Sequence, residues 1–84
     1  MANLVTFQFT GDDYVNVETA TEVTFTADST YAIQSHDYDF YIREGSVGDG
    51  FYVKALETVY FTAGSDDLYI KPSIWHKATV NIAN

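Results

Sequence analysis

The residues of this chain that could perform acid–base or nucleophilic chemistry are few and lie far apart in the sequence. His36 and His76 are its two imidazoles, and neither stands in a motif that would bring a base within hydrogen-bonding distance of a nucleophile. No serine has the Gly-x-Ser-x-Gly setting of a nucleophile elbow. The chain has no cysteine, which excludes a thiolate nucleophile, a disulfide and a zinc-thiolate site. We therefore expect a protein that is not an enzyme and has no cofactor.

Acidic residues in pairs are the next candidates, because carboxylate oxygens are the ligands that Ca²⁺ prefers. The pairs are Asp12 with Asp13, Asp37 with Asp39, and Asp66 with Asp67. Their spacing fits no calcium-binding loop, and aspartate favours turns for its own backbone hydrogen bonds. We expect no bound metal at these pairs, and a calcium ion held in one of the turns is the alternative that the sequence leaves open.

The charge balance excludes several kinds of partner. Twelve acidic against four basic side chains give a net charge of −8 and a pI near 4.2, which repels a phosphate backbone and an anionic membrane surface alike. No run of roughly 18 apolar residues is present that could span a membrane, and Met1-Ala2-Asn3-Leu4 lacks the charged start and apolar run of a secretion signal. We expect a soluble protein with no nucleic-acid or membrane partner.

The elements that must position any site are predicted to be strands. Apolar residues recur with period two along most of the chain, and they are mostly Val, Ile, Phe and Tyr, interleaved with Thr. No stretch has the helical period, so the pattern predicts no helix. The alternation predicts strands over 4–10, 14–18, 22–27, 31–34, 38–43, 51–53, 58–62 and 68–71, and a last strand with Ala78, Val80 and Ile82 facing inward.

Turn residues separate these runs about every 8 to 12 positions, which is the spacing of a small antiparallel sandwich or barrel. The pattern predicts one all-β domain over residues 1–84, a small antiparallel β-sandwich of seven or eight short strands with jelly-roll-like or Greek-key connections. A domain of this size buries a modest core, and without disulfides it commonly gains stability from a bound metal or by associating with further copies. We therefore expect a homo-oligomer.

Tyrosines occupy positions that should face solvent. Tyr41, Tyr60 and Tyr69 alternate with inward apolar residues in three predicted strands, so both faces of that sheet would be apolar. Tyrosine suits protein interfaces, because its ring is apolar and its hydroxyl tolerates water. Trp75, shortly after Pro72, is the other exposed candidate. The sequence leaves three interpretations of these aromatic residues open: a subunit interface, an aromatic platform that binds a sugar or peptide, and the ordinary composition of strands.

The N-terminal run from Ala2 to Thr10 is a further candidate contact. Val5, Phe7 and Phe9 share one face of it, and such a strand can add to the sheet edge of a neighbouring protein. We therefore count these three side chains among the predicted interface residues. An ordinary first strand with one dry face accounts equally for the pattern.

Five segments of the chain resemble a known group of proteins. They are Tyr31-Ala-Ile-Gln-Ser, Phe40-Tyr-Ile-Arg-Glu-Gly, Val53-Lys-Ala-Leu-Glu-Thr-Val-Tyr-Phe-Thr-Ala-Gly, Leu68-Tyr-Ile-Lys and Ala78-Thr-Val-Asn-Ile-Ala. Over residues 22–83 the chain thereby resembles small all-β virion proteins of tailed bacteriophages, of the head decoration or cement type. Such chains often have a Pro-Gly-Glu turn where this one has Lys54-Ala55-Leu56-Glu57.

The resemblance implies a protein of the capsid surface that is often a homotrimer and clamps neighbouring copies of the major capsid protein without catalysis. One alternative is a carbohydrate-binding or adhesin-like module, in which Tyr41, Tyr60, Tyr69 or Trp75 would stack on sugar rings and a glycan would be the partner. Another is a component of the tail or neck of the virion.

Overall fold

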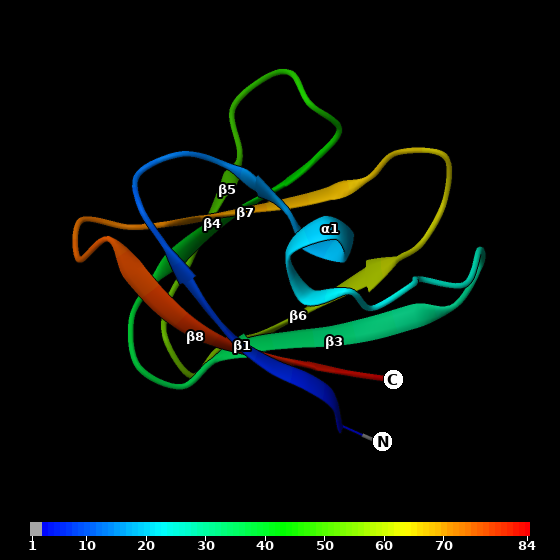
Figure 1. Cartoon of the computed structure of the whole chain (residues 1–84), viewed down its shortest axis with the longest axis horizontal. Helices are drawn as coiled ribbons and strands as arrows, with labels where there is room; N and C mark the ends of the chain where they lie inside the picture. Colours follow the sequence, from blue (N-terminus) through cyan, green and yellow to red (C-terminus); the bar gives the residue numbers. More distant parts are fainter. Residues whose placement is uncertain (1–2) are drawn as a thin grey trace.

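A computed structural model describes residues 3–84, which form two antiparallel four-stranded sheets and one short helix (Figure 1). The elements in chain order are β1 (Asn3–Thr10), β2 (Val15–Asn16), α1 (Val17–Thr21), β3 (Thr30–Ser35), β4 (Phe40–Glu44), β5 (Phe51–Val53), β6 (Thr58–Thr62), β7 (Leu68–Pro72) and β8 (Lys77–Ala83). The predicted small antiparallel sandwich is confirmed.

The strands pair like the two arms of one long antiparallel hairpin, and this hairpin is folded so that its paired strands form two sheets. One sheet has the order β1-β8-β3-β6 and the other the order β2-β7-β4-β5. Each strand of the first half of the chain therefore pairs with its counterpart from the second half: β1 with β8, β2 with β7, β3 with β6, and β4 with β5. This is the arrangement of an eight-stranded jelly roll, one of the two predicted topologies.

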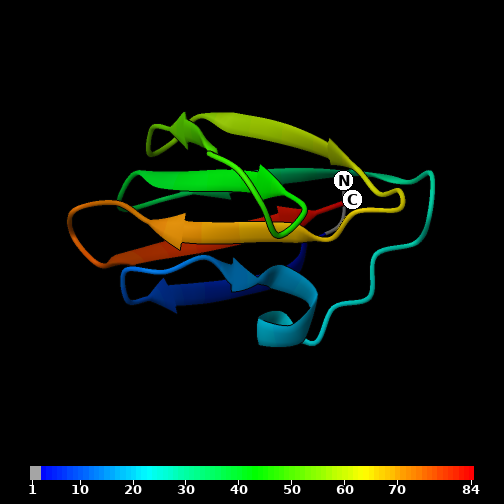
Figure 2. The same ribbon diagram turned by 90° about the horizontal axis from the view of Figure 1, so that it is seen from above.

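Because the strands pair in this way, the connections between them lie at the two ends of the sandwich (Figure 2). The turns β1–β2, β3–β4, β5–β6 and β7–β8, at residues 11–14, 36–39, 54–57 and 73–76, lie together at one end; we call it the turn end. The other connections lie at the opposite end. They are β2–β3, which contains α1, and the connections β4–β5 and β6–β7. The fold thus brings together turns that are far apart in the sequence.

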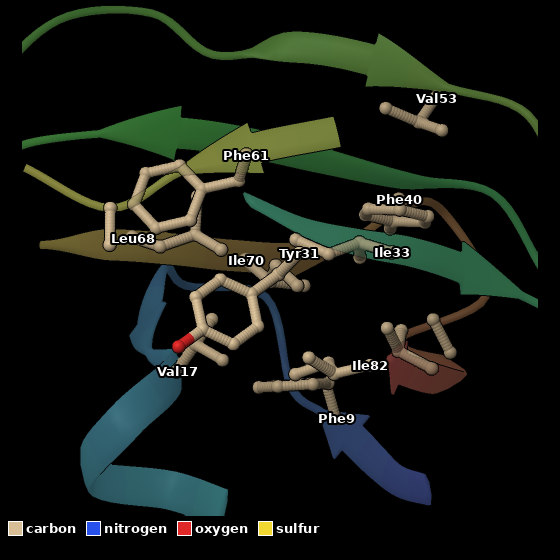
Figure 3. Packing of buried hydrophobic residues seen from close by; sticks show 13 residues of the cluster. Phe9, Val17, Tyr31, Ile33, Phe40, Val53, Phe61, Leu68, Ile70 and Ile82 are labelled. Atoms are coloured by element: carbon tan, nitrogen blue, oxygen red, sulfur yellow. The ribbon is translucent and has the colours of Figure 1, made fainter. Parts of the chain in front are cut away.

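Strand alternation fills the space between the sheets (Figure 3). Val80 and Ile82 of β8 and Ile33 of β3 are fully buried, as are Phe40 and Ile70 from the opposite sheet. Burying a side chain of this size contributes about 1.5–3 kcal/mol relative to its exposed state. The inward face predicted for the last strand is confirmed.

The prediction that the chain has no helix is wrong, because α1 forms one turn and a half directly after β2. The side chain of Asn16 accepts a hydrogen bond from the N–H of Thr19 at 3.1 Å and so caps the helix N-terminus. Glu22, with φ of 64°, ends the helix and donates its N–H to the carbonyl of Glu18. The helix is held by its caps and by buried Val17 rather than by a periodic apolar face.

The strand predicted over 22–27 is also wrong. This segment has no strand partner, and its backbone N–H groups bond to side chains instead: that of Phe25 to the Glu18 carboxylate at 2.9 Å and that of Thr26 to the Tyr31 hydroxyl at 2.7 Å. The Phe25 ring packs on that of Tyr31, with centroids 4.5 Å apart. The alternation in this segment reflects packing against the core and not a sheet ladder.

Candidate functional site

The turn end exposes large apolar side chains on two turns. Ile74 and Trp75 on the β7–β8 turn are 81% and 59% exposed, and Leu56 on the β5–β6 turn is 68% exposed. We call these three residues the apolar tip. The Trp75 ring lies against that of Tyr38 on the β3–β4 turn, with centroids 5.5 Å apart. A single exposed apolar side chain is ordinary, but several of them on the turns at one end of a sandwich are typical of a docking surface.

Asp39 ties these turns to one another. Its carboxylate accepts the N–H of Ala55 at 2.8 Å and the hydroxyl of Tyr52, and its backbone carbonyl accepts the N–H of Ser73 at 3.2 Å. The Tyr52 and Ala55 bonds, aided by the charge of Lys54, hold the pKa of Asp39 below its usual value, and the same carboxylate raises the pKa of Tyr52. The β5–β6 and β7–β8 turns are therefore fixed to one residue of the β3–β4 turn.

Asp37 anchors the same turn to β8. Its carboxylate accepts the N–H and the hydroxyl of Thr79 and the N–H of Tyr38, each at 2.7 Å, and the Ser35 hydroxyl at 3.1 Å. Partial burial alone would raise the pKa of Asp37, but these hydrogen bonds together outweigh it and lower the pKa. Charge-assisted hydrogen bonds of Asp37 and Asp39 thus hold the turns at this end of the sandwich, which carries the apolar tip.

Leu56 is held in a backbone conformation that suits leucine poorly. Its φ is 72°, in the left-handed region that glycine and asparagine tolerate better. Its N–H bonds to the carbonyl of Ser35 and its carbonyl accepts the side-chain N–H of Gln34, both at 2.7 Å. Because the side chain is exposed and the backbone disfavours it, folding alone does not account for a leucine here.

A groove opens between β5 and β6, which are edge strands of different sheets. Its volume is about 440 Å³, and Val53, Val59 and Phe61 line its walls. Val47 and Phe51 also line it and are 85% and 78% exposed. We call this hollow the β5–β6 groove. Unpaired strand edges beside an apolar hollow are a common place for protein contacts.

The three tyrosines predicted to make one sheet apolar on both faces do not share a sheet, so that expectation is corrected. Tyr41 and Tyr69 lie on β4 and β7 in one sheet, whereas Tyr60 lies on β6 in the other. Lys71 stands over the Tyr41 ring at 4.9 Å and Arg43 over the Tyr69 ring at 5.3 Å. Both rings are half-buried under cations of their own chain. Of the three tyrosines, Tyr60 is the one that remains accessible to solvent, with 66% of its surface exposed.

The N-terminal run is placed as the first strand. Ala2 lies outside the described residues. Phe9 is 1% exposed and packs in the core of its own sandwich, and its part in an interface stays a prediction. Val5 and Phe7 are partly buried against that core on the edge strand β1, and their part in an interface stays a prediction.

Sequence reasoning missed four exposed residues of the apolar tip and the β5–β6 groove: Val47, Phe51, Leu56 and Ile74. Val47 lies between Ser46 and Gly48, and Leu56 lies in a segment interpreted as a connection. A large apolar side chain inside a turn segment is the signal that could have identified both. Phe51 begins a strand, and its exposure follows only from the edge position of β5.

Within residues 3–84, no three His, Asp or Glu side chains lie close enough together to hold a metal ion. In the same range no helix is long and apolar enough to cross a membrane. Asp37 and Asp39, one of the pairs considered for calcium, direct their oxygens to backbone and hydroxyl donors. Comparisons of the chain with protein-family models, with curated proteins and with solved structures gave no match.

Proposed function

We propose that this protein is a non-enzymatic structural component of a phage virion, a decoration protein that binds the capsid lattice as a homotrimer at the capsid surface. One observation carries the proposal: a small domain with a net charge of −8 exposes large apolar side chains on two separate surfaces, the apolar tip and the β5–β6 groove. A protein that joins neighbours needs more than one contact surface, whereas a free monomer gains nothing from exposing them.

The chemistry of the tip supports docking. Trp75, Ile74 and Leu56 are of the aromatic and aliphatic types that form the dry centre of protein interfaces. The bonds of Asp37 and Asp39 hold the tip in place, which lowers the entropy lost on binding. An acidic exterior elsewhere keeps a crowded particle surface soluble. The sequence resemblance to phage head proteins supplies the biological setting.

The proposal is tested on purified particles of the phage expected to encode this protein. Heads and tails are separated, and the protein is quantified in each fraction by mass spectrometry against the major capsid protein. We expect it in the head fraction, at a copy number comparable with that of the capsid protein. Its absence from particles, or its presence in the tail fraction alone, would overturn the proposal.

Carbohydrate binding is a second candidate, because the adjacent Trp75 and Tyr38 rings at an exposed end of a sandwich could stack on sugar rings. The jelly roll also occurs in lectins. A glycan array probed with the wild type and with Trp75→Ala tests it. Binding that the substitution abolishes would support this function, and an array without binding would remove it.

A further inference from the structure

The β5–β6 groove has a free strand edge along one of its walls. β6 (Thr58–Thr62) ends the sheet order β1-β8-β3-β6, so within residues 3–84 no strand pairs with its outer edge. All five residues of β6 are uncharged and either β-branched or aromatic, which is the composition of a strand that pairs well. This edge is therefore suited to accept a further strand.

The hydrogen-bond pattern shows which backbone groups of β6 face that edge. Ala63 donates its N–H to the carbonyl of Ser29 at 2.9 Å, next to the regular pairing of β6 with β3. In an antiparallel ladder every second residue bonds to a given neighbour, so Phe61 and Val59 also bond to β3. The residues that alternate with them direct their N–H and carbonyl groups to the free edge: Thr58, Tyr60 and Thr62.

Side chains of a strand added at this edge would enter the groove. Residues that lie opposite each other on paired strands point to the same face of the sheet. Every second residue of the added strand would therefore lie beside Val59 and Phe61, over a hollow of about 440 Å³. Val47 and Phe51, 85% and 78% exposed, also line that hollow. Apolar residues at alternate positions of the added strand would cover these exposed side chains.

The other edge strands are less suited to pairing. β2 has two residues and β5 has three, and the register of β1 with β8 is irregular between Asn3 and Val5. Short strands and irregular pairing are common ways in which proteins prevent an edge from accepting another strand. β6 has neither feature, and it borders the groove.

The charges of the groove favour one kind of segment. Glu44 and Asp49 are in its lining. Arg43 also lines it, but its guanidinium group donates to the carbonyls of Gly45 and Gly48 in its own loop. Together with the net charge of −8, the two carboxylates favour a basic segment. A second copy of this acidic chain is disfavoured for the same reason.

We propose that the β5–β6 groove binds an extended segment of a partner protein, which adds to the edge of β6 as a fifth strand of that sheet. The segment has apolar residues at alternate positions and is flanked by lysine or arginine. In such strand addition, backbone hydrogen bonds give affinity and the alternate side chains give specificity. The inference rests on the docking role of the groove in the proposed function, and it names the kind of segment that docks there.

A synthetic peptide of the sequence Lys-Val-Thr-Val-Thr-Val-Lys is the probe, and the same peptide with both lysines replaced by glutamate is its control. The protein is titrated with each peptide up to millimolar concentration, and its amide groups are followed by NMR and by hydrogen exchange. We expect the N–H groups of Tyr60 and Thr62 to shift and to exchange at least tenfold more slowly in the complex. The glutamate peptide should bind at least tenfold more weakly.

Proline substitutions distinguish the two long edges of this sheet. Tyr60→Pro removes an N–H that faces the free edge, a place where strands tolerate proline. Gln8→Pro is the matched control on β1: Gly11 donates to the carbonyl of His76, so the same alternation places the N–H of Gln8 at the opposite free edge. Tyr60→Pro should bind the lysine peptide at least tenfold more weakly than the wild type, and Gln8→Pro should bind it equally well. Because hydrogen exchange is measured on the wild type, the test does not depend on the folding of either variant.

Three results would overturn the inference. They are the absence of shifts at Tyr60 and Thr62 with millimolar lysine peptide, equal binding by a folded Tyr60→Pro variant and the wild type, and tighter binding of the glutamate peptide. Protection of these amides in the protein alone, lost on dilution, would assign the edge to a second copy and so overturn the inference as well. All these measurements use the isolated protein, so the fractionation of phage particles still decides the proposed function separately.

Discussion

The hydroxyl of Tyr14 occupies the space that a side chain at position 50 would need, so Tyr14 and Gly50 fit directly against each other. Tyr14 precedes β2, and Gly50 ends the β4–β5 loop, which contributes to the β5–β6 groove. Arg43 lies over the Tyr14 ring at 4.0 Å and donates to the carbonyls of Gly45 and Gly48 at 2.9 and 3.2 Å. The loop is thereby fixed to the outer face of its sheet.

Gly50→Ala should destabilise the fold. A Cβ at this position would meet the Tyr14 hydroxyl and would lie 2.7 Å from the carbonyl oxygen of Ile42, a backbone atom that cannot rotate away. We expect a loss of about 1–3 kcal/mol in the free energy of unfolding, the usual cost of overpacking. Gly64→Ala is the control, because no atom lies within 4 Å of its Cβ position. Urea denaturation measures both variants, and equal stability of the two would contradict the close fit.

Acid should weaken the turn end through Asp37 and Asp39. Their pKa values are lower in the folded protein than usual, so their stabilisation is complete above the usual aspartate value and is lost as the pH falls below about 4. Asp37→Asn should cost roughly 1 kcal/mol at neutral pH through weaker hydrogen bonds and should flatten the decline of stability in acid. Denaturation at several pH values tests this, with Asp12→Asn as the control. An Asp37→Asn variant as acid-sensitive as the wild type would argue against the assignment.

Leu56→Gly should leave the fold as stable as the wild type or stabilise it by up to about 1 kcal/mol, because glycine relieves the left-handed backbone. The same change should weaken docking, since it removes an exposed side chain of the apolar tip. Asp28→Gly, at a position with φ of 68° away from the turn end, should relieve strain without affecting docking. Melting curves and binding to phage heads separate the two effects. A loss of more than about 1 kcal/mol in Leu56→Gly would show that this leucine serves the fold.

Phe9 and Phe51 should respond oppositely to truncation. Phe9 is 1% exposed, so Phe9→Ala should cost about 3–5 kcal/mol and leave little folded protein. Phe51 is 78% exposed, so Phe51→Ala should change the stability of the monomer by less than about 0.5 kcal/mol. Urea titration of dilute protein measures both. A severe loss of stability in Phe51→Ala would assign that ring to the core rather than to the groove.

Period-two alternation predicts which residues of a strand share a face, but it does not predict which sheet the strand joins. The inward positions Ala78, Val80 and Ile82 were predicted and are buried. Tyr41 and Tyr60 were expected on one sheet and lie on different sheets, because the jelly roll alternates strands between its layers. That assignment depends on pairing between distant segments, which a local pattern does not contain.

The errors over residues 14–27 have a local cause. A helix of five residues is too short to show a period of 3.6, so α1 left no periodic signal. Its capping residue Asn16, which favours helix starts and turns alike, was the available sign. Phe25 alternates like a strand residue because it packs on the core from a segment without a partner. Exposure of Leu56 and Phe51 likewise follows from the fold and not from residue type.

Native mass spectrometry of the purified protein across the micromolar range is the most direct test of the central claim, that this structural protein associates with copies of itself. The account predicts a trimer that dissociates on dilution. A monomer at every concentration would contradict the account.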